Sequence, residues 1–263
     1  MGIYIKSQKE IEKIRVAGKI VAQTIDYINH HLKPEMTLVE IEKLCDDFIR
    51  KQNAIPAFKG YRGFPASVCI SLNEEVVHGI PDNRKVKLGD LVKIDIGVYK
   101  DGYYADAATT IPVGKIRPEV QKLICVTEQA LYLGIKQAYA GNRIGDISFA
   151  IQKFVESNGF SVVRELSGHG VGIELHEEPM IPNYGIAGKG IELKPGMTLA
   201  IEPMVNMGTY EVITLKNNWT VVTKDGLPSA HFEHTILITE TAPEILTAEN
   251  SRLTKSTSCC ITN

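Results

Sequence analysis

A short turn between two apolar segments constrains the fold of this chain more than any other feature. The first segment, Leu91–Val98, reads LVKIDIGV, and the second runs from Tyr103 to Ile111. Between them lies Asp101-Gly102, a dipeptide that favours a two-residue hairpin loop and would pair Lys100 with Tyr103. The sequence therefore predicts a long antiparallel hairpin whose register is set by this turn.

Two acidic residues interrupt the apolar pattern of the hairpin. If pairing continues outward from the turn, Asp95 lies opposite Ala108, and Asp106 lies diagonally from Asp95 on the same face. Two carboxylates on one face of a buried hairpin repel each other and are costly to remove from water, and a bound cation would offset both effects. Asp95 taken alone has another interpretation, because single acids in strands also occur at edges and turns.

Part of the hairpin recurs roughly a hundred residues later, a period too long for a stack of short repeats. Lys87–Asp95 is echoed by Lys194–Glu202, since both begin Lys-x-Gly and end in an acid after an apolar strand. Upstream of these acids, His78–Pro81 is matched by His176–Pro179. We interpret the echo as a diverged duplication whose two copies fold around one core.

The duplication predicts pseudo-symmetric halves over about residues 7–112 and 117–245. Capping-box patterns at Ser7 and Thr37 start two helices, and Pro118 opens the next pair. Helices are expected near 7–31, 37–49, 118–139 and 146–158. Strands are expected at 68–72, 76–78 and in the 95–111 hairpin, and then at 162–163, 199–202, 219–222 and 234–238. Because helices and antiparallel hairpins come in runs rather than alternating singly, the pattern favours an α+β fold.

Composition excludes several classes of protein. The chain has 263 residues, 44% of them hydrophobic and 23% charged, and a formal net charge of -2, so its charge favours neither nucleic acid nor an anionic membrane as partner. No apolar run is long enough to span a bilayer. The five cysteines form no CxxC pair, and their odd number indicates a reducing compartment, which we expect to be the cytoplasm. We expect one domain over residues 1–250 and a polar, disordered tail over 251–263.

Acids and one histidine in apolar or glycine-rich contexts form a candidate ligand set. Its members are Asp95, Asp106, His169, Glu202 and Glu233. Four carboxylates and an imidazole suit a pair of divalent first-row metal ions, because hard oxygen ligands can bridge two ions. His169 has a second interpretation as a loop residue, since it lies in the run GHGVG, which is only a weak signal for phosphate binding. His30, His31 and His231 are expected at the surface.

Seven short motifs follow one another along the chain. They are NEEVVHGIP from Asn73, DIG from Asp95, YAD from Tyr104, GHGVG from Gly168, HEEP from His176, IEP from Ile201 and FEHT from Phe232. Together they resemble type I methionine aminopeptidases of the bacterial kind, over about residues 4 to 245. The resemblance implies a pseudo-symmetric "pita-bread" fold, an antiparallel sheet with helices on its outer face. It also implies removal of the initiator Met from nascent proteins whose second residue is small.

The resemblance assigns roles to the candidate ligands, with two divalent ions of Co, Mn, Fe(II) or Zn as cofactors. Asp95 would bind one ion, and Asp106 and Glu233 would bridge both. His169 and Glu202 would bind the other ion. A water between the ions would attack the scissile bond, with Glu202 as proton acceptor.

Two further histidines and an apolar pocket complete the implied site. His176 would hydrogen-bond to the scissile carbonyl as it becomes an oxyanion, and His78 would contact the substrate amide or the leaving group. The pocket for the Met side chain would comprise Tyr61, Phe64, Cys69, Leu175 and Trp219. Expected partners are the N-termini of nascent polypeptides at the ribosome, with no sequence-specific nucleic-acid binding, no membrane contact and a monomeric state.

Two competing functions remain open on the sequence. A proline-specific aminopeptidase or prolidase would share the fold, but those enzymes carry an additional N-terminal domain for which this chain has no room. A non-catalytic binding protein that has lost its metals would lack ligands, whereas the five expected here are all present.

Overall fold

The computed structural model describes residues 2–248 of the chain. Its helices are α1 Gln8–His31, α2 Leu38–Lys51, α3 Pro118–Ile135 and α4 Ile144–Ser157, with a 3-10 turn η1 at Tyr61–Gly63. The strands of the first half are β1 Ile55–Pro56, β2 Cys69–Leu72, β3 Glu75–Val77, β4 Leu91–Lys100 and β5 Tyr103–Pro112. Those that follow α4 are β6 Ser161–Val162, β7 Ser167–Gly170, β8 Glu177–Pro182, β9 Thr198–Ile201, β10 Met204–Asn206, β11 Val212–Thr214, β12 Val221–Thr223, β13 Ser229–His231, β14 His234–Leu237 and β15 Glu244–Ile245.

The predicted hairpin is present, in the predicted register. β4 and β5 pair antiparallel with Lys100 opposite Tyr103 and Asp95 opposite Ala108, so that Asp106 faces Gly97. Asp101 and Gly102 both have positive φ, as a tight hairpin loop of this kind requires.

The first two helices begin at the predicted capping boxes. The Ser7 N–H donates to Glu10 Oε2 at 2.7 Å, and the Thr37 N–H donates to Glu40 Oε2 at 2.7 Å. The apolar face of α1 then packs on β4 and β5 and buries a stripe of side chains that includes Ile14. The helical spacing read from the sequence therefore identifies the face that covers the sheet.

The second half repeats this plan with shorter strands. β9 pairs antiparallel with β14, with Ile201 opposite His234. The next residues outward from this pair are Glu202 and Glu233, which face each other across the strand ends. β7 joins the other edge of β9, with His169 opposite Ala200.

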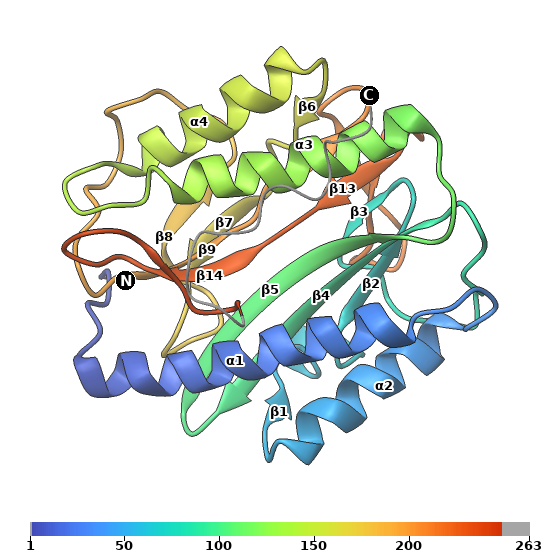
Figure 1. Cartoon of the computed structure of the whole chain (residues 1–263), viewed down its shortest axis with the longest axis horizontal. Helices are drawn as coiled ribbons and strands as arrows, with labels where there is room; N and C mark the ends of the chain where they lie inside the picture. Colours follow the sequence, from blue (N-terminus) through green and yellow to red (C-terminus); the bar gives the residue numbers. More distant parts are fainter. Residues whose placement is uncertain (1, 249–263) are drawn as a thin grey trace.

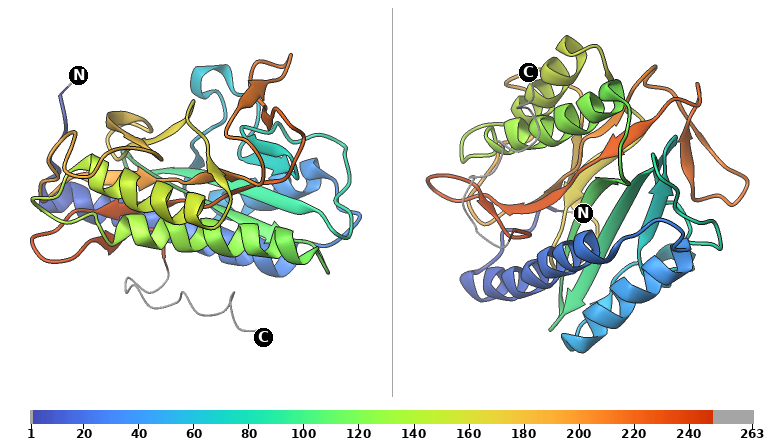
Figure 2. Two further views of the ribbon diagram at one scale, coloured as in Figure 1. Left: turned by 90° about the horizontal axis from the view of Figure 1, so that it is seen from above. Right: turned by 45° about the vertical axis from the view of Figure 1, so that its right-hand side comes forward.

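Helices cover one face of the strands, as the α+β prediction requires. Figure 1 shows β5 and β14 side by side in the middle of the molecule, with α1 and α2 along one half and α3 and α4 along the other. Both turned views in Figure 2 keep the helices on one side of the strands. Each half has its own apolar cluster, one around Ile14 and Ile94 and the other around Leu123 and Leu199.

Some boundaries differ from the sequence prediction. α3 ends at Ile135, not near 139, because the next N–H groups make tight turns: Gln137 donates to Gly134 O and Ala138 to Ile135 O, each at 2.9 Å. β7 and β8 were not predicted, since glycines in one and prolines in the other hide the strand pattern. The division at 7–112 and 117–245 stays a prediction, and the tail over 251–263 lies outside the described residues.

Two threonine hydroxyls join the halves along the seam between β5 and the strands β13 and β14. Thr235 accepts a hydrogen bond from the Asp106 N–H at 3.1 Å and donates to the Asp106 carbonyl at 2.8 Å. Thr110 does the same for His231, at 2.9 and 2.7 Å. Both threonines are buried, so each hydroxyl replaces a missing strand partner for two main-chain groups.

Replacing the Thr110 hydroxyl by a methyl group tests this seam. Thr110→Val has nearly the same volume but leaves a buried N–H and C=O unpaired, so we expect it to lower the free energy of unfolding by about 1–3 kcal/mol. Urea unfolding of the metal-free protein measures the change. Thr109→Val is the matched control, because Thr109 is the adjacent, half-buried residue on the other face of β5. Equal effects of the two variants would contradict the role given to the hydroxyl.

Candidate active site

One cavity collects acids and histidines from both halves of the chain. Its lining residues are Phe58, Tyr61, Arg62, Phe64, Cys69, His78, Asp95, Asp106, His169, His176, Glu202, Trp219 and Glu233. Of the site residues expected from the sequence, all but Leu175 line this cavity. They come from strands and from the segments that connect strands on both sides of the seam, which explains why acids far apart in the sequence meet here.

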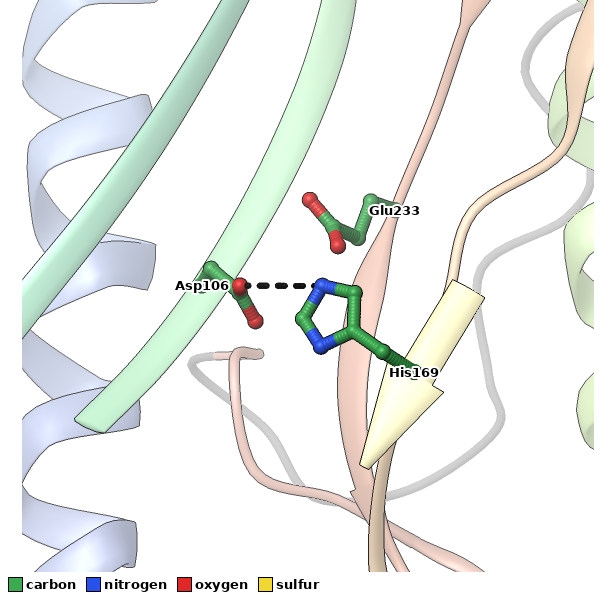
Figure 3. A group of neighbouring side chains, drawn as sticks. All are labelled: Asp106, His169 and Glu233. Carbon is green, nitrogen blue, oxygen red and sulfur yellow. Dashed lines mark ion pairs between the residues drawn. The ribbon is translucent and has the colours of Figure 1, made fainter. Parts of the chain in front are cut away.

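Asp106, His169 and Glu233 form the centre of the acidic cluster. One ligand atom from each lies within 4.8 Å of the others, and Figure 3 shows the three side chains pointing toward a common space, from β5, from β7 and from the link between β13 and β14. His169 Nε2 is 3.6 Å from Asp106 Oδ2 and also 3.6 Å from Glu202 Oε1. The imidazole therefore lies between an acid of the first half and an acid of the second.

The His169 ring is held with one defined nitrogen toward the acids. Its Nδ1 lies 2.9 Å from the Gly170 carbonyl, which can only accept, so Nδ1 carries the hydrogen and Nε2 keeps its lone pair. His169 lies in β7 and not in a loop. A side chain at Gly170 would place its Cβ 2.4 Å from the Glu178 carbonyl oxygen, so glycine is required next to His169 for the backbone of β8 to pack this closely.

Burial and mutual repulsion make the four acids reluctant to ionise on their own. Desolvation, followed by the charges of neighbouring acids, raises the pKa of Asp95, Glu202 and Glu233 well above the ordinary values. Desolvation also raises the pKa of Asp106, although His169 and the Thr235 hydroxyl act in the opposite direction. Each group is held where a negative charge has little water to stabilise it.

This donor set fits divalent cations. Asp95 Oδ1 is buried and has no hydrogen-bond partner in the described part of the chain, although a buried carboxylate oxygen normally has one. Four carboxylates converging with a free imidazole nitrogen offer oxygen and nitrogen ligands that Mn, Fe, Co and Zn all accept. Cations here would satisfy the unpaired oxygen and cancel the repulsion among the acids.

Two other histidines border the cluster as neutral rings. Desolvation, with help from the charges of His169 and Arg62, lowers the pKa of His176 to about 3. Burial also lowers the pKa of His78, whose backbone has a φ of 58°. Positive φ at a residue other than glycine is strained, and such strain is concentrated at functional sites.

The orientation of His176 is fixed from two sides. Its Nδ1 lies 2.9 Å from the Tyr61 hydroxyl, and the two rings stack with centroids 5.1 Å apart. The preceding turn is closed by the buried carboxylate of Glu177, which accepts the N–H groups of Ile173 and Glu174 at 2.6 and 3.0 Å. The other oxygen of Glu177 pairs with the buried ammonium of Lys6, so the N-terminal segment stabilises the turn that carries His176.

An apolar pocket opens beside the acids. Phe64 and Trp219 meet edge to face with centroids 5.1 Å apart, and Cys69 is buried beneath them. Leu175 does not line the cavity, which corrects the sequence expectation; it is 1% exposed and packs in the same apolar cluster behind the lining side chains.

Sequence reasoning missed two lining residues, Phe58 and Arg62. Phe58 lies over Gly97, where a Cβ would come within 2.4 Å of its ring, so the glycine opposite Asp106 was the available signal for a close approach. Arg62 is exposed and lies beside the Tyr61 ring, and no sequence pattern distinguished it.

His231 was expected at the surface, and this was wrong. It is 1% exposed, and its Nε2 lies 3.4 Å from Glu202 Oε2. Its position two residues before Glu233 in a buried strand segment was the signal that could have placed it inside.

Comparison with known proteins settles the family. Residues 12–240 match the model of metallopeptidase family M24. The chain is 54% identical over 245 residues to methionine aminopeptidase 1 of Bacillus subtilis, covering 93% of this chain and 99% of that relative. The chain belongs to the M24 metallopeptidases.

Solved structures of methionine aminopeptidases are also similar to this chain. The structure of methionine aminopeptidase from Thermotoga maritima superposes with a TM-score of 0.93 at 49% identity, covering 94% of this chain and all of that one. A prolidase from Pyrococcus furiosus is 24% identical with a TM-score of 0.77, and this chain covers only 66% of it. This prolidase therefore shares the fold, while the closer sequence and full-length match lie with the methionine aminopeptidases.

Proposed function

We propose that this chain is a metal-dependent methionyl aminopeptidase that removes the initiator Met from nascent proteins whose second residue is small. One observation carries the proposal: one cavity holds four carboxylates and a free imidazole nitrogen directly beside an apolar pocket. The first feature suits hydrolysis with bound metal ions, and the second suits an uncharged, extended side chain. The family membership and the identity of 54% to a named methionine aminopeptidase support the same reading.

The acids and His169 would hold two divalent ions of Co, Mn, Fe(II) or Zn. Asp95 would bind one ion, Asp106 and Glu233 would be shared, and Glu202 with His169 would bind the other. When bound, such ions lower the pKa of water and polarise a carbonyl oxygen. Because His169 has no counterpart beside Asp95, the two ion positions have different ligands and should differ in affinity.

The neutral histidines can act directly on the substrate. If the Tyr61 hydroxyl donates to His176 Nδ1, the hydrogen of His176 resides on Nε2 and can be donated to the scissile carbonyl oxygen. His78 lines the same cavity and would contact the substrate amide. Glu202 would accept the proton released during hydrolysis and pass it toward the leaving amine.

The apolar pocket would receive the Met side chain. Tyr61, Phe64, Cys69 and Trp219 line it, and Leu175 supports it from behind. Aromatic rings and a polarizable thioether make favourable contacts, so this lining favours Met over charged or branched polar side chains.

The cellular setting belongs to the same proposal. The substrates would be the N-termini of polypeptides emerging from the ribosome, processed by a monomer in the cytoplasm. Within residues 2–248, no helix has the length and apolarity needed to cross a membrane. The net charge of -2 gives no support to a role in binding nucleic acid.

Two alternatives make different predictions. A prolidase-type enzyme would cleave peptides with proline in second position, and its support is a shared fold at 24% identity. A binding protein without catalysis would be expected to have lost ligands, whereas the expected acids and His169 all line one cavity.

A peptide assay separates these functions. Protein stripped of metal and then refilled with Mn, Co or Fe(II) should release Met from a Met-Gly-Ser peptide. It should spare the matched Met-Lys-Ser peptide, because a bulky second residue would collide with the metal centre. Metal content and free Met are measured in the same samples. Preferred cleavage of Xaa-Pro peptides would move the assignment to the prolidases, and no cleavage with any metal would favour a binding protein.

The charge on Asp106 should be essential for activity. Asp106→Asn keeps an oxygen for the Thr235 hydroxyl but removes charge from the proposed shared ligand, so kcat/KM should fall by more than about 100-fold. Metal-free stability should not fall, since one of four repelling carboxylates is gone. Asp101→Asn makes the same chemical change at the exposed hairpin turn and is the control. Full activity of Asp106→Asn would rule out the shared-ligand role.

A further inference from the structure

His231 has a buried side chain that takes no part in the proposed catalysis. Its backbone is fixed, because the Thr110 hydroxyl binds both its N–H and its carbonyl, and β13 pairs it with Met204 of β10. The side chain is fully enclosed and does not line the cavity. The ring therefore approaches the site from behind the lining residues.

The ring nitrogen of His231 faces one of the candidate ligands. Nε2 is 3.4 Å from Glu202 Oε2, and no other buried side-chain nitrogen in residues 2–248 lacks a hydrogen-bond partner. The second oxygen of the same carboxylate, Oε1, lies on the side of His169 Nε2 at 3.6 Å. Glu202 is thus placed between one histidine in the cavity and one histidine outside it.

The chemistry of this contact fixes which group can donate. A carboxylate that binds a cation is an acceptor only, so the His231 nitrogen that faces it must carry the hydrogen. A separation of 3.4 Å is longer than an ordinary N–H···O bond, and such contacts often shorten when the site binds its ligand. A buried N–H and a buried carboxylate oxygen each gain from this bond, since neither has water to replace it.

We propose that His231 is a positioning residue for the metal centre: it donates Nε2–H to Glu202 Oε2 and thereby presents Oε1 toward His169 and the ion. The proposal rests on the ligand role proposed above for Glu202. Hydrogen bonds to the outer oxygen of a ligating carboxylate orient it and strengthen metal binding. Because Glu202 would hold only one of the two ions, His231 should affect that ion position and leave the other unchanged.

The proposal is tested by substitutions of His231 that place an N–H donor at different distances from Glu202 or remove it. His231→Gln carries an amide that can occupy the place of Nε2, His231→Asn carries the same amide one bond shorter, and His231→Met carries no donor. The exposed His31→Met is the matched control. Mn²⁺ binding to each metal-free protein is measured by isothermal titration calorimetry, and thermal unfolding without metal shows whether each variant folds.

The unmodified protein and His31→Met should take up two equivalents of Mn²⁺. His231→Met and His231→Asn should weaken one of the two binding steps by about 10–100-fold and leave the other unchanged, while His231→Gln stays within a few-fold of the unmodified protein. The Gln and Asn pair preserves the test if His231→Met fails to fold, since both keep a polar group of similar size.

Two results would overturn the proposal. Binding by His231→Asn that equals that of the unmodified protein would show that the contact does not support Glu202, and equal weakening of both steps would indicate a general structural role. These failures are separate from failure of the proposed function: two-step Mn²⁺ binding with the expected effect of His231→Asn, but no methionyl activity, would remove the function and leave the positioning role. No Mn²⁺ uptake by the unmodified protein would overturn both.

Discussion

The repulsion among four buried carboxylates is the constraint on which the rest of this structure depends. Asp95 and Asp106 share one hairpin face, and Glu202 and Glu233 meet them from the other half. Desolvation raises the pKa of all four, and the charges of neighbouring acids add to this for Asp95, Glu202 and Glu233, so the cluster is unfavourable unless cations neutralise it. The scaffold must therefore hold the acids together against their own repulsion. The hydroxyls of Thr235 and Thr110 help to hold the acids in place at the seam. Their hydrogen bonds fix the main chain at Asp106 and at His231 although the sheet is not continuous there.

Duplication explains why such a site can form, and divergence explains why it is not symmetric. Each half contributes two helices and an antiparallel pair that carries two acids. In the second half, β7 adds the imidazole of His169 to the site. Among the four acids, Glu202 is the one whose carboxylate faces the buried His231 in the described part of the chain. The two proposed ion positions would therefore be unequal in ligands and in support. On the substrate side, local desolvation lowers the pKa of His78 and His176, so both rings are neutral and could donate a hydrogen bond to a developing oxyanion without adding positive charge beside the ions.

The sequence predicted the parts of the site that depend on local rules. The Asp-Gly turn determined the β4–β5 register residue by residue, and the echo of Lys87–Asp95 at Lys194–Glu202 indicated where the second pair of acids begins. The prediction from the sequence failed for residues whose position is determined by packing against distant parts of the chain. His231 was expected at the surface because its burial comes from contacts with β5 and β10, which are distant in sequence. Leu175 was expected to line the pocket, but it packs in the same apolar cluster without lining the cavity. β7 was missed because the glycines that permit its close packing also resemble a loop.

If acids from both halves form one site for two cations, Mn²⁺ should occupy it. Anomalous diffraction from crystals of the protein equilibrated with Mn²⁺ locates the ions without assuming an activity. We expect two strong peaks inside the cavity, one beside Asp95 and one beside His169 and Glu202, with Asp106 and Glu233 between them. A single peak that contacts acids of one half only, or peaks outside the cavity, would contradict it.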